Sequence, residues 1–234
     1  MFKFIRRLIT LILLCIILVV SGFVYIGYKE YETVVKETPL EDKVYEIQSR
    51  YTYVSHEYIA QDYFDALMAI EDKRFASHSG VDYIALVRTI LANIVAKDVL
   101  GGGSTITQQL AKNMYFMDSN TITRKISEAF VAYELEEKYS KSEIIELYAN
   151  VVYFGDNYYG IYNASKGYFN VHPIDLSLAQ ASMLAGLPQA PSIYALSNNN
   201  PASYARQEEV LKAMLELDMI TTDELVSALR EDLQ

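Results

Sequence analysis

The sequence predicts an all-α domain that follows a single transmembrane helix. An uncharged run of 21 residues, Leu8–Tyr28, is long enough to cross the ~30 Å core of a bilayer at ~1.5 Å per residue. Ser140, Ser177 and Thr221 are each followed three residues later by a glutamate or glutamine, which is the spacing of a helix capping box. Alternating strand patterns are scarce, so the domain should be built from helices.

The N-terminal segment is expected to be an uncleaved anchor. Lys3, Arg6 and Arg7 precede the apolar run, and such a positive flank favours the cytoplasmic side. We therefore expect a cytoplasmic tail over 1–7, a transmembrane anchor over 8–28 in the cell membrane, and the rest of the chain outside the cytoplasm. The alternative is a cleaved secretory signal, but no convincing small-x-small cleavage site follows the run.

Length and composition favour one domain behind this anchor. The chain has 234 residues, 51% of them hydrophobic, which is enough for one well-buried core. Residues 29–50 are polar and mixed, include Pro39, and are expected to form a juxtamembrane linker or extended segment, leaving 51–234 as the globular domain. Because the only cysteine, Cys15, lies in the anchor and the histidines number three, neither a disulfide framework nor a structural zinc site is expected.

Charge is unevenly distributed along the chain. All 30 acidic residues follow Lys29, whereas four of the 20 basic residues precede Glu30, so the part after the anchor has a formal charge of −14. Such a domain is not expected to bind nucleic acid. The segment Glu71–Lys141, however, holds nine basic and nine acidic residues. An anionic ligand is therefore expected there if anywhere, with ordinary variation in surface charge as the alternative.

Glu71 lies in line with an apolar helix stripe. Four apolar side chains share one face of the helix expected here: Ala60, Phe64, Leu67 and Met68. Burying a charged carboxylate is costly, so we expect Glu71 to point into a cleft, as a general base would; the alternative is a helix-end glutamate that bends out to solvent or pairs with Arg74. Asp82 is expected to cap the next helix.

The motif GGGSTITQQLAKN, residues 101–113, joins a glycine-rich loop to a helix N-terminus, where free amides and the helix dipole favour an anion such as phosphate. The polar arc of that helix holds Thr105, Gln108, Gln109 and Lys112, and the opposite, core side holds Ile106, Leu110, Met114 and Met117. These neutral donors and one cation suit sugar hydroxyls and a phosphate, and a solvated face is the alternative. The motif is not a nucleotide P-loop because the G-K-[ST] ending is missing.

The segment that starts at Thr121 predicts an enclosed helix, because it is apolar on two sides. Arg124 and Glu128 are four residues apart on one of these sides. They form either a structural ion pair or a set of polar groups that line a cleft. The following helix, opened by Ser140, carries Tyr148 and Tyr153 near its end.

Five ordered motifs together resemble the peptidoglycan glycosyltransferase family, which comprises monofunctional enzymes and the N-terminal halves of bifunctional penicillin-binding proteins. The motifs are EDKRFASHSG, GGSTITQQLAKN, RKISE, KSEIIELYANVVYFG and LAGLPQAPSIY, and the resemblance runs from about His56 to the C-terminus. It implies a lysozyme-like fold and the polymerisation of lipid II, a disaccharide-peptide on a polyprenyl diphosphate, at the outer face of the membrane. The implied partners are lipid II, the growing glycan strand and the membrane, with other cell-wall synthesis proteins as further candidates.

The resemblance also implies roles for individual residues. Glu71 matches the base that takes the proton from the acceptor sugar's 4-hydroxyl as this attacks the donor's anomeric carbon with inversion. Glu128 matches a second glutamate that organises the diphosphate end, either directly or through a divalent cation (Mg or Mn). Donor-side positions that contact sugar and diphosphate are matched by Ser104, Thr105, Gln109, Lys112, Asn113, Arg124 and Lys125. Other positions lining the cleft are matched by Asp72, Phe75, His78, Tyr148 and Tyr153.

Two departures from the family pattern leave this chemistry untouched. Gln180 stands where the family usually has glutamate, and Ala149 stands where leucine is more usual. No Ser-x-x-Lys motif occurs in the sequence, so we expect no penicillin-sensitive transpeptidase. Two rival functions remain open: a membrane-anchored, lysozyme-like glycan hydrolase, which needs two carboxylates but no grip on a diphosphate, and a catalytically silent scaffold for cell-wall proteins.

Overall fold

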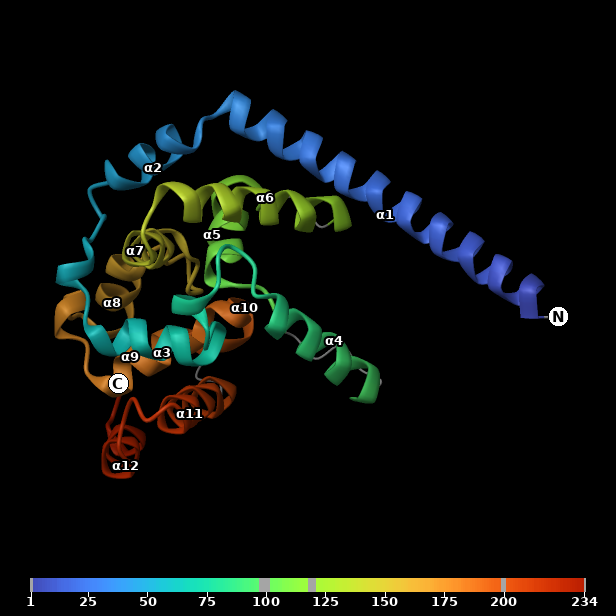
Figure 1. The fold of residues 1–234 in the computed structure, drawn as a ribbon. Helices are drawn as coiled ribbons and strands as arrows, with labels where there is room; N and C mark the ends of the chain where they lie inside the picture. Colours follow the sequence, from blue (N-terminus) through green and yellow to red (C-terminus); the bar gives the residue numbers. More distant parts are fainter. Residues whose placement is uncertain (1, 97–101, 118–120, 199–200, 234) are drawn as a thin grey trace.

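The structure, a computed structural model, describes residues 2–96, 102–117, 121–198 and 201–233, and these residues form helices and short connections (Figure 1). The helices are α1 (Phe2–Glu37), α2 (Leu40–Gln48), α3 (Gln61–Glu71), α4 (Tyr83–Ala96), α5 (Ile106–Tyr115), α6 (Ile122–Lys138), α7 (Lys141–Val151), α8 (Ile161–Phe169), α9 (Leu178–Gly186), α10 (Pro191–Tyr194), α11 (Pro201–Glu216) and α12 (Thr222–Arg230). No β-strand occurs within those ranges. The predicted all-α class is confirmed.

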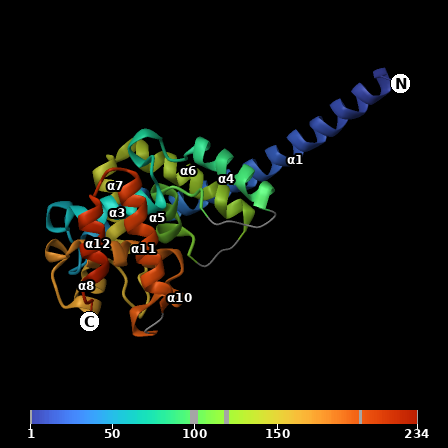
Figure 2. The same ribbon diagram turned by 90° about the horizontal axis from the view of Figure 1, so that it is seen from below.

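Helix α1 contains the predicted membrane-spanning segment. Among the described helices it is the one long and apolar enough to cross a membrane, with a mean hydropathy of 2.9 over its most apolar stretch. Its side chains from Phe2 to Ile26 are exposed, and the helix projects from the domain as a single rod (Figures 1 and 2).

The juxtamembrane segment 29–50 differs from the expected linker or extended segment. Helix α1 continues without a break to Glu37, and α2 follows after Pro39. Leu40, Val44 and Ile47 of α2 are buried in the hydrophobic core. These three residues lie on one helical face, a stripe that the many charges between them obscure in the sequence. The globular domain therefore includes α2.

Helix starts agree with the capping signals. The three predicted capping boxes, at Ser140, Ser177 and Thr221, each contain both reciprocal hydrogen bonds. Asp82 caps α4, since its Oδ1 accepts hydrogen bonds from two backbone amides of the first turn. The pair Asn200–Pro201 also predicts a helix start, with proline at the first helical position. Helix α11 begins at Pro201, while Asn200 lies outside the described residues.

The domain core joins two groups of helices. Helices α3, α9 and α11 pack against one another, and α5 packs against both α6 and α7. The largest fully buried side chains include Tyr63 and Phe64 of α3, Leu110 of α5 and Tyr148 of α7. Because α3 ends where the two groups meet, its last residue, Glu71, lies between them.

Candidate active site

Two cavities adjoin Glu71. The larger has a volume of about 470 Å³ and is lined by Ile70, Glu71, Gly102, Ser104, Gln108, Gln109, Lys112, Arg124, Lys125, Glu128, Gln189 and Arg206. The smaller, of about 180 Å³, shares Ile70, Glu71, Gly102 and Ser104 with it. We call them the main cavity and the side cavity. A carboxylate at the boundary of two cavities can contact ligands in both.

The Glu71 carboxylate is held from both helix groups. Its side chain is 13% exposed, and Oε2 accepts a hydrogen bond of 2.7 Å from Nε2 of Gln109 on α5. Oε1 lies 3.3 Å from Nη2 of Arg206 on α11. An ionised carboxylate has about four lone-pair sites, so these two bonds leave acceptor capacity for a ligand hydroxyl. Of the two sequence-based alternatives, the inward-facing one is confirmed, and Arg74 pairs with Asp82 instead of Glu71.

Tyr148 fixes the orientation of Gln109. The phenol is buried, and its OH donates to Oε1 of Gln109 at 3.1 Å, which leaves Nε2 to face Glu71. Burial raises the pKa of the Tyr148 phenol well above its usual range, and the negative charge of Glu71 adds to this effect. The phenol therefore stays protonated and remains a donor.

Cationic side chains line the main cavity around Glu128. The Glu128 side chain is fully buried, with Oε1 at 3.1 Å from Nε of Arg124 and Oε2 at 2.7 Å from Nζ of Lys125. The sequence left open whether Arg124 and Glu128 form an ion pair or line a cleft, and the structure shows that they do both. Lys112 has no ion-pair partner in the part of the chain that the structure describes, so its ammonium is available to an anionic ligand.

Asp72 braces the start of α5 beside the side cavity. Its Oδ2 accepts a hydrogen bond from the Ile106 amide at 3.0 Å, and Nε2 of His78 lies 2.9 Å from the same oxygen. Burial raises the pKa of the Asp72 carboxyl, while His78 and the Ile106 amide oppose that shift. The side cavity also carries the cations Lys73, Arg74 and Arg88.

The structure brings most, but not all, of the expected site residues together. The main cavity is lined by Glu71, Ser104, Gln109, Lys112, Arg124, Lys125 and Glu128, and the side cavity adds Asp72 and Thr105. The remaining five expected residues line neither cavity: Phe75, His78, Asn113, Tyr148 and Tyr153.

These five side chains make contacts outside the two cavities. His78 contacts Asp72, and Tyr148 reaches Glu71 only through Gln109. Phe75 is buried, with Nζ of Lys141 4.4 Å from its ring centre. Asn113 lines a different cavity, and Tyr153 stacks on Tyr159 with ring centres 4.6 Å apart. In this structure none of the five lines either cavity, and their roles in substrate binding stay predictions.

Sequence reasoning missed Arg206, although a usable signal was present. Arg206 lies on the buried face of α11 with Gln207, Val210 and Met214. A charged residue on an apolar helix stripe is the same signal that singled out Glu71. Gln189, which also lines the main cavity, carries no comparable signal. Met117, expected on the core side of α5, follows the helix end and is half exposed.

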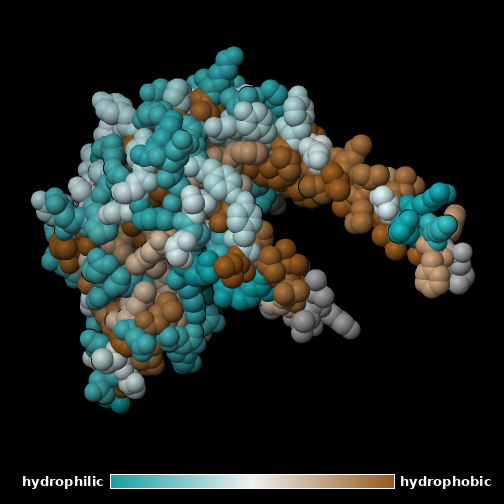
Figure 3. Space-filling model, viewed as in Figure 1, coloured by the Kyte–Doolittle hydropathy of each residue, from teal (hydrophilic) through white to brown (hydrophobic). Residues whose placement is uncertain are grey.

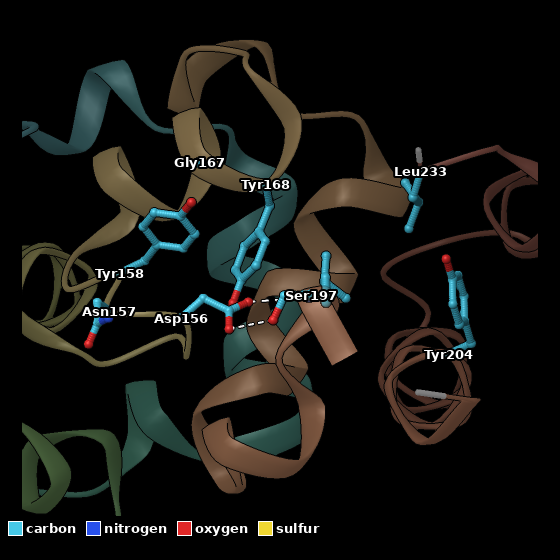
Figure 4. A pocket seen from close by; sticks show the side chains of 9 residues that line it. Asp156, Asn157, Tyr158, Gly167, Tyr168, Ser197, Tyr204 and Leu233 are labelled. Atoms are coloured by element: carbon cyan, nitrogen blue, oxygen red, sulfur yellow. Dashed lines mark hydrogen bonds between the residues drawn. The ribbon is translucent and has the colours of Figure 1, made fainter. Parts of the chain in front are cut away.

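A separate cavity of about 580 Å³ shares no lining residue with the two around Glu71 (Figure 4). Its walls include Tyr158, Tyr168 and Tyr204. Its one carboxylate, Asp156, accepts a hydrogen bond of 2.6 Å from Oγ of Ser197. This cavity has no cationic lining residue among those described and is not a candidate for an anionic substrate.

Fold and site together define a helical enzyme domain in which an inward-facing carboxylate meets a cation-lined cavity. Comparison with known proteins gives the family. The transglycosylase family model matches residues 39–215, and the chain belongs to this family, the peptidoglycan glycosyltransferases that its motifs resemble. The match begins one residue before α2, which agrees with the inclusion of α2 in the domain.

The curated relatives are much longer proteins. The chain is 47% identical over 169 residues to penicillin-binding protein 1A of Neisseria flavescens, which covers 72% of this chain and 21% of the relative. It is 41% identical over 187 residues to penicillin-binding protein 1A of Aquifex aeolicus, which covers 80% of this chain and 26% of the relative. A crystal structure of penicillin-binding protein 1A from Haemophilus influenzae matches 54% of this chain and 16% of that chain, at 25% identity and a TM-score of 0.37. The chain thus spans about a fifth to a quarter of the length of these curated relatives.

Proposed function

We propose that this chain polymerises lipid II into glycan strands by inverting glycosyl transfer, with release of polyprenyl diphosphate. One observation carries the proposal. The carboxylate of Glu71 borders a cavity that also contains Lys112, Arg124 and Lys125. A base beside fixed positive charge suits a reaction in which a neutral hydroxyl attacks and an anionic diphosphate leaves.

In the proposed reaction Glu71 removes a proton from the acceptor, and the cations of the main cavity bind the diphosphate of the donor. Glu71 accepts the proton of the acceptor's 4-hydroxyl while that oxygen forms a bond to the donor's anomeric carbon. The bond between this carbon and the diphosphate oxygen breaks, and the diphosphate departs with the bonding electron pair. Lys112, Arg124 and Lys125 stabilise the charge that develops on the diphosphate. The donor occupies the main cavity, and the acceptor approaches Glu71 from the side cavity.

Glu128 is proposed to orient the two cations beside it. Its Oε2 lies 2.7 Å from Nζ of Lys125 and its Oε1 lies 3.1 Å from Nε of Arg124, but Oε1 accepts no hydrogen bond among the described residues. Divalent cations such as Mg are usually held by one or two carboxylates that remain open to them, together with substrate phosphates. If Mg or Mn binds together with the substrate diphosphate, Glu128 would hold it and the ion would add positive charge at the leaving group, but no step of the proposed reaction depends on it.

The proposed location is the cell membrane, with the N-terminus cytoplasmic and the catalytic domain outside. Helix α4 supports a second membrane contact, because its exposed side chains include Ile84, Val87, Ile90 and Leu91. Helices α1 and α4 project from the same side of the domain (Figures 1 and 2), and apolar surface covers both (Figure 3). An apolar face beside the anchor would lie at the surface that delivers a lipid-linked substrate.

We also propose that the contact between α1 and α6 holds α6 close to the membrane surface, where the diphosphate of a lipid-linked substrate would lie. Gly27 is the buried residue of α1, and a Cβ atom built on it would lie 2.7 Å from the side chain of Ile126. Oγ of Ser127 lies 2.9 Å from the Gly27 carbonyl and 3.0 Å from a carboxylate oxygen of Glu30. The contact places Arg124 and Lys125, on the same helix, near the point where α1 leaves its apolar stretch.

Gly27→Leu is expected to lower polymerisation of membrane-embedded lipid II about tenfold, because the larger side chain separates α1 from α6, and a 1 Å misplacement can cost as much as a hundredfold. The measurement is the initial rate in proteoliposomes. Gly22→Leu is the matched control, since Gly22 lies on the same helix and a Cβ atom added to it would meet no other atom within 4 Å, so its rate should match the wild type. Equal effects of the two changes would contradict the proposed contact.

Lys112→Ala is expected to weaken donor binding by at least tenfold and acceptor binding by less than threefold, because Lys112 lines the main cavity only. Initial rates measured while each substrate is varied in turn would separate the two. Lys73→Ala, which removes a cation from the side cavity, is the reciprocal control. Equal losses at both subsites in Lys112→Ala would refute its assignment to the donor.

Incubation of the full chain with labelled lipid II tests the proposed function directly. Polymer together with released polyprenyl diphosphate supports it. Shortening of added glycan, without polymer, would replace it with hydrolysis, and a protein that does neither would be a scaffold.

A further inference from the structure

Arg206 of α11 connects the candidate base, at the end of α3, to the Gly186 carbonyl of α9 within the same helix group. It is 8% exposed, and its guanidinium contacts three acceptors. Nη2 lies 3.3 Å from Oε1 of Glu71, Nη1 lies 2.9 Å from Oε2 of Glu209, and Nε donates to the Gly186 carbonyl at 3.4 Å. We propose that Arg206 is a positioning residue for glycosyl transfer, which holds the Glu71 carboxylate in the orientation needed to accept the acceptor's proton. This inference rests on the proposed function.

The position of Glu71 explains why it needs such a partner. Glu71 is the last residue of α3, so no following turn of the same helix restricts its side chain. Gln109 holds one carboxylate oxygen from α5, and Arg206 holds the other from α11. With both oxygens held, the carboxylate has one orientation at the boundary of the two cavities. A general base must lie within hydrogen-bond reach of the proton that it takes, so loss of this orientation should slow the chemical step.

Arginine suits this role better than lysine does. The guanidinium is a rigid planar fork with five donors, and here it makes contacts in three directions at once. A lysine ammonium is a point charge on a flexible stem, so it could pair with Glu71 but could not also hold the Gly186 carbonyl and Glu209 in the same geometry. Burial of the charge is costly unless such partners are present, which means that the contacts with Glu71 and Gly186 also keep Arg206 in place.

Gly186 provides independent support for a fixed Arg206 stem. A Cβ atom built on Gly186 would lie 2.9 Å from Cγ of Arg206 and 3.3 Å from Cγ2 of Val210. The Gly186 backbone has φ −80° and ψ −24°, a conformation that alanine adopts without strain. The missing side chain therefore leaves room for Arg206. Gly186→Ala offers a way to displace Arg206 while every charge in the site is kept.

The test compares steady-state lipid II polymerisation by the full chain and three variants: Arg206→Lys, Gly186→Ala and Glu208→Gln. We expect kcat to fall 10- to 100-fold in Arg206→Lys and about tenfold in Gly186→Ala, with KM within threefold of the wild type in both. Glu208 lies on the same helix as Arg206, pairs with Lys212 and lines neither cavity, so Glu208→Gln should stay within twofold of the wild type. Circular dichroism would show that each variant is folded.

Several results would overturn the inference. A kcat within threefold of the wild type in both Arg206→Lys and Gly186→Ala would exclude a positioning role. A loss confined to KM would make Arg206 a direct contact of the donor, since it also lines the main cavity. If Arg206→Lys does not fold, the test rests on Gly186→Ala. An unchanged kcat in Gly186→Ala would then refute the proposal. Absence of polymer from the wild type is a different outcome, because it removes the proposed function and the inference with it.

Discussion

Glu71→Gln is expected to lower lipid II polymerisation by at least a hundredfold and to leave the fold intact. General bases typically contribute 10²- to 10⁴-fold to a rate, and the amide of glutamine cannot accept the proton. The substitution keeps the shape of the side chain, and a carbonyl oxygen that can accept the hydrogen bond from Gln109 remains. Initial rates and thermal unfolding of the full chain would measure both effects.

The fold measurement separates catalysis from structure. Glu71→Gln removes one partner of Arg206, which keeps Glu209 and the Gly186 carbonyl as acceptors. We therefore expect the midpoint of thermal unfolding to change by only a few degrees. If the variant is unfolded, Glu71 is a structural residue and the loss of activity carries no information about the base.

Asp72→Ala is expected to destabilise the domain by about 3 kcal/mol, because two buried donors lose their acceptor at ~1–3 kcal/mol each. The donors are the Ile106 amide and the His78 ring, and Asp72 itself is buried. Loss of this contact should loosen the first turn of α5, which leads to Gln109. Urea unfolding followed by circular dichroism would measure the free-energy change.

Asp72→Asn is the matched control for this prediction. Its amide oxygen can still accept from the Ile106 amide, so it should cost less than half as much as Asp72→Ala. If both variants have wild-type stability, Asp72 does not brace α5 and a direct role in substrate binding becomes the better interpretation.

Local patterns predicted most of the helices and singled out Glu71. The apolar stripe ending in Glu71 left open whether the carboxylate points into a cleft or outward, and the structure shows that it points inward, whereas the three capping boxes predicted three helix starts. These signals are local, since each depends on residues within one or two helical turns. Helix α2 was missed because the charged residues between Leu40, Val44 and Ile47 hid a short apolar face.

Contacts between side chains that are far apart in the sequence could not be predicted from local patterns. Arg206 meets Glu71 from a position 135 residues further along the chain, and only the packing of α3 against α11 brings them together. Phe75 and His78 lie in the same motif as Glu71, yet the Phe75 ring is buried, the His78 ring contacts Asp72, and neither residue lines a cavity beside Glu71. A motif identifies a segment near the site, whereas the tertiary fold decides which of its side chains face the cavity.

The most direct test of the account is the binding of polyprenyl diphosphate to the full chain in detergent, compared among the wild type, Glu71→Gln and Lys112→Ala. The account predicts that Glu71→Gln binds this product lipid at least as tightly as the wild type, because only a negative charge is lost, while Lys112→Ala binds it at least tenfold more weakly. Wild-type affinity in Lys112→Ala, together with lost binding in Glu71→Gln, would contradict the separation of the base from the diphosphate-binding cations.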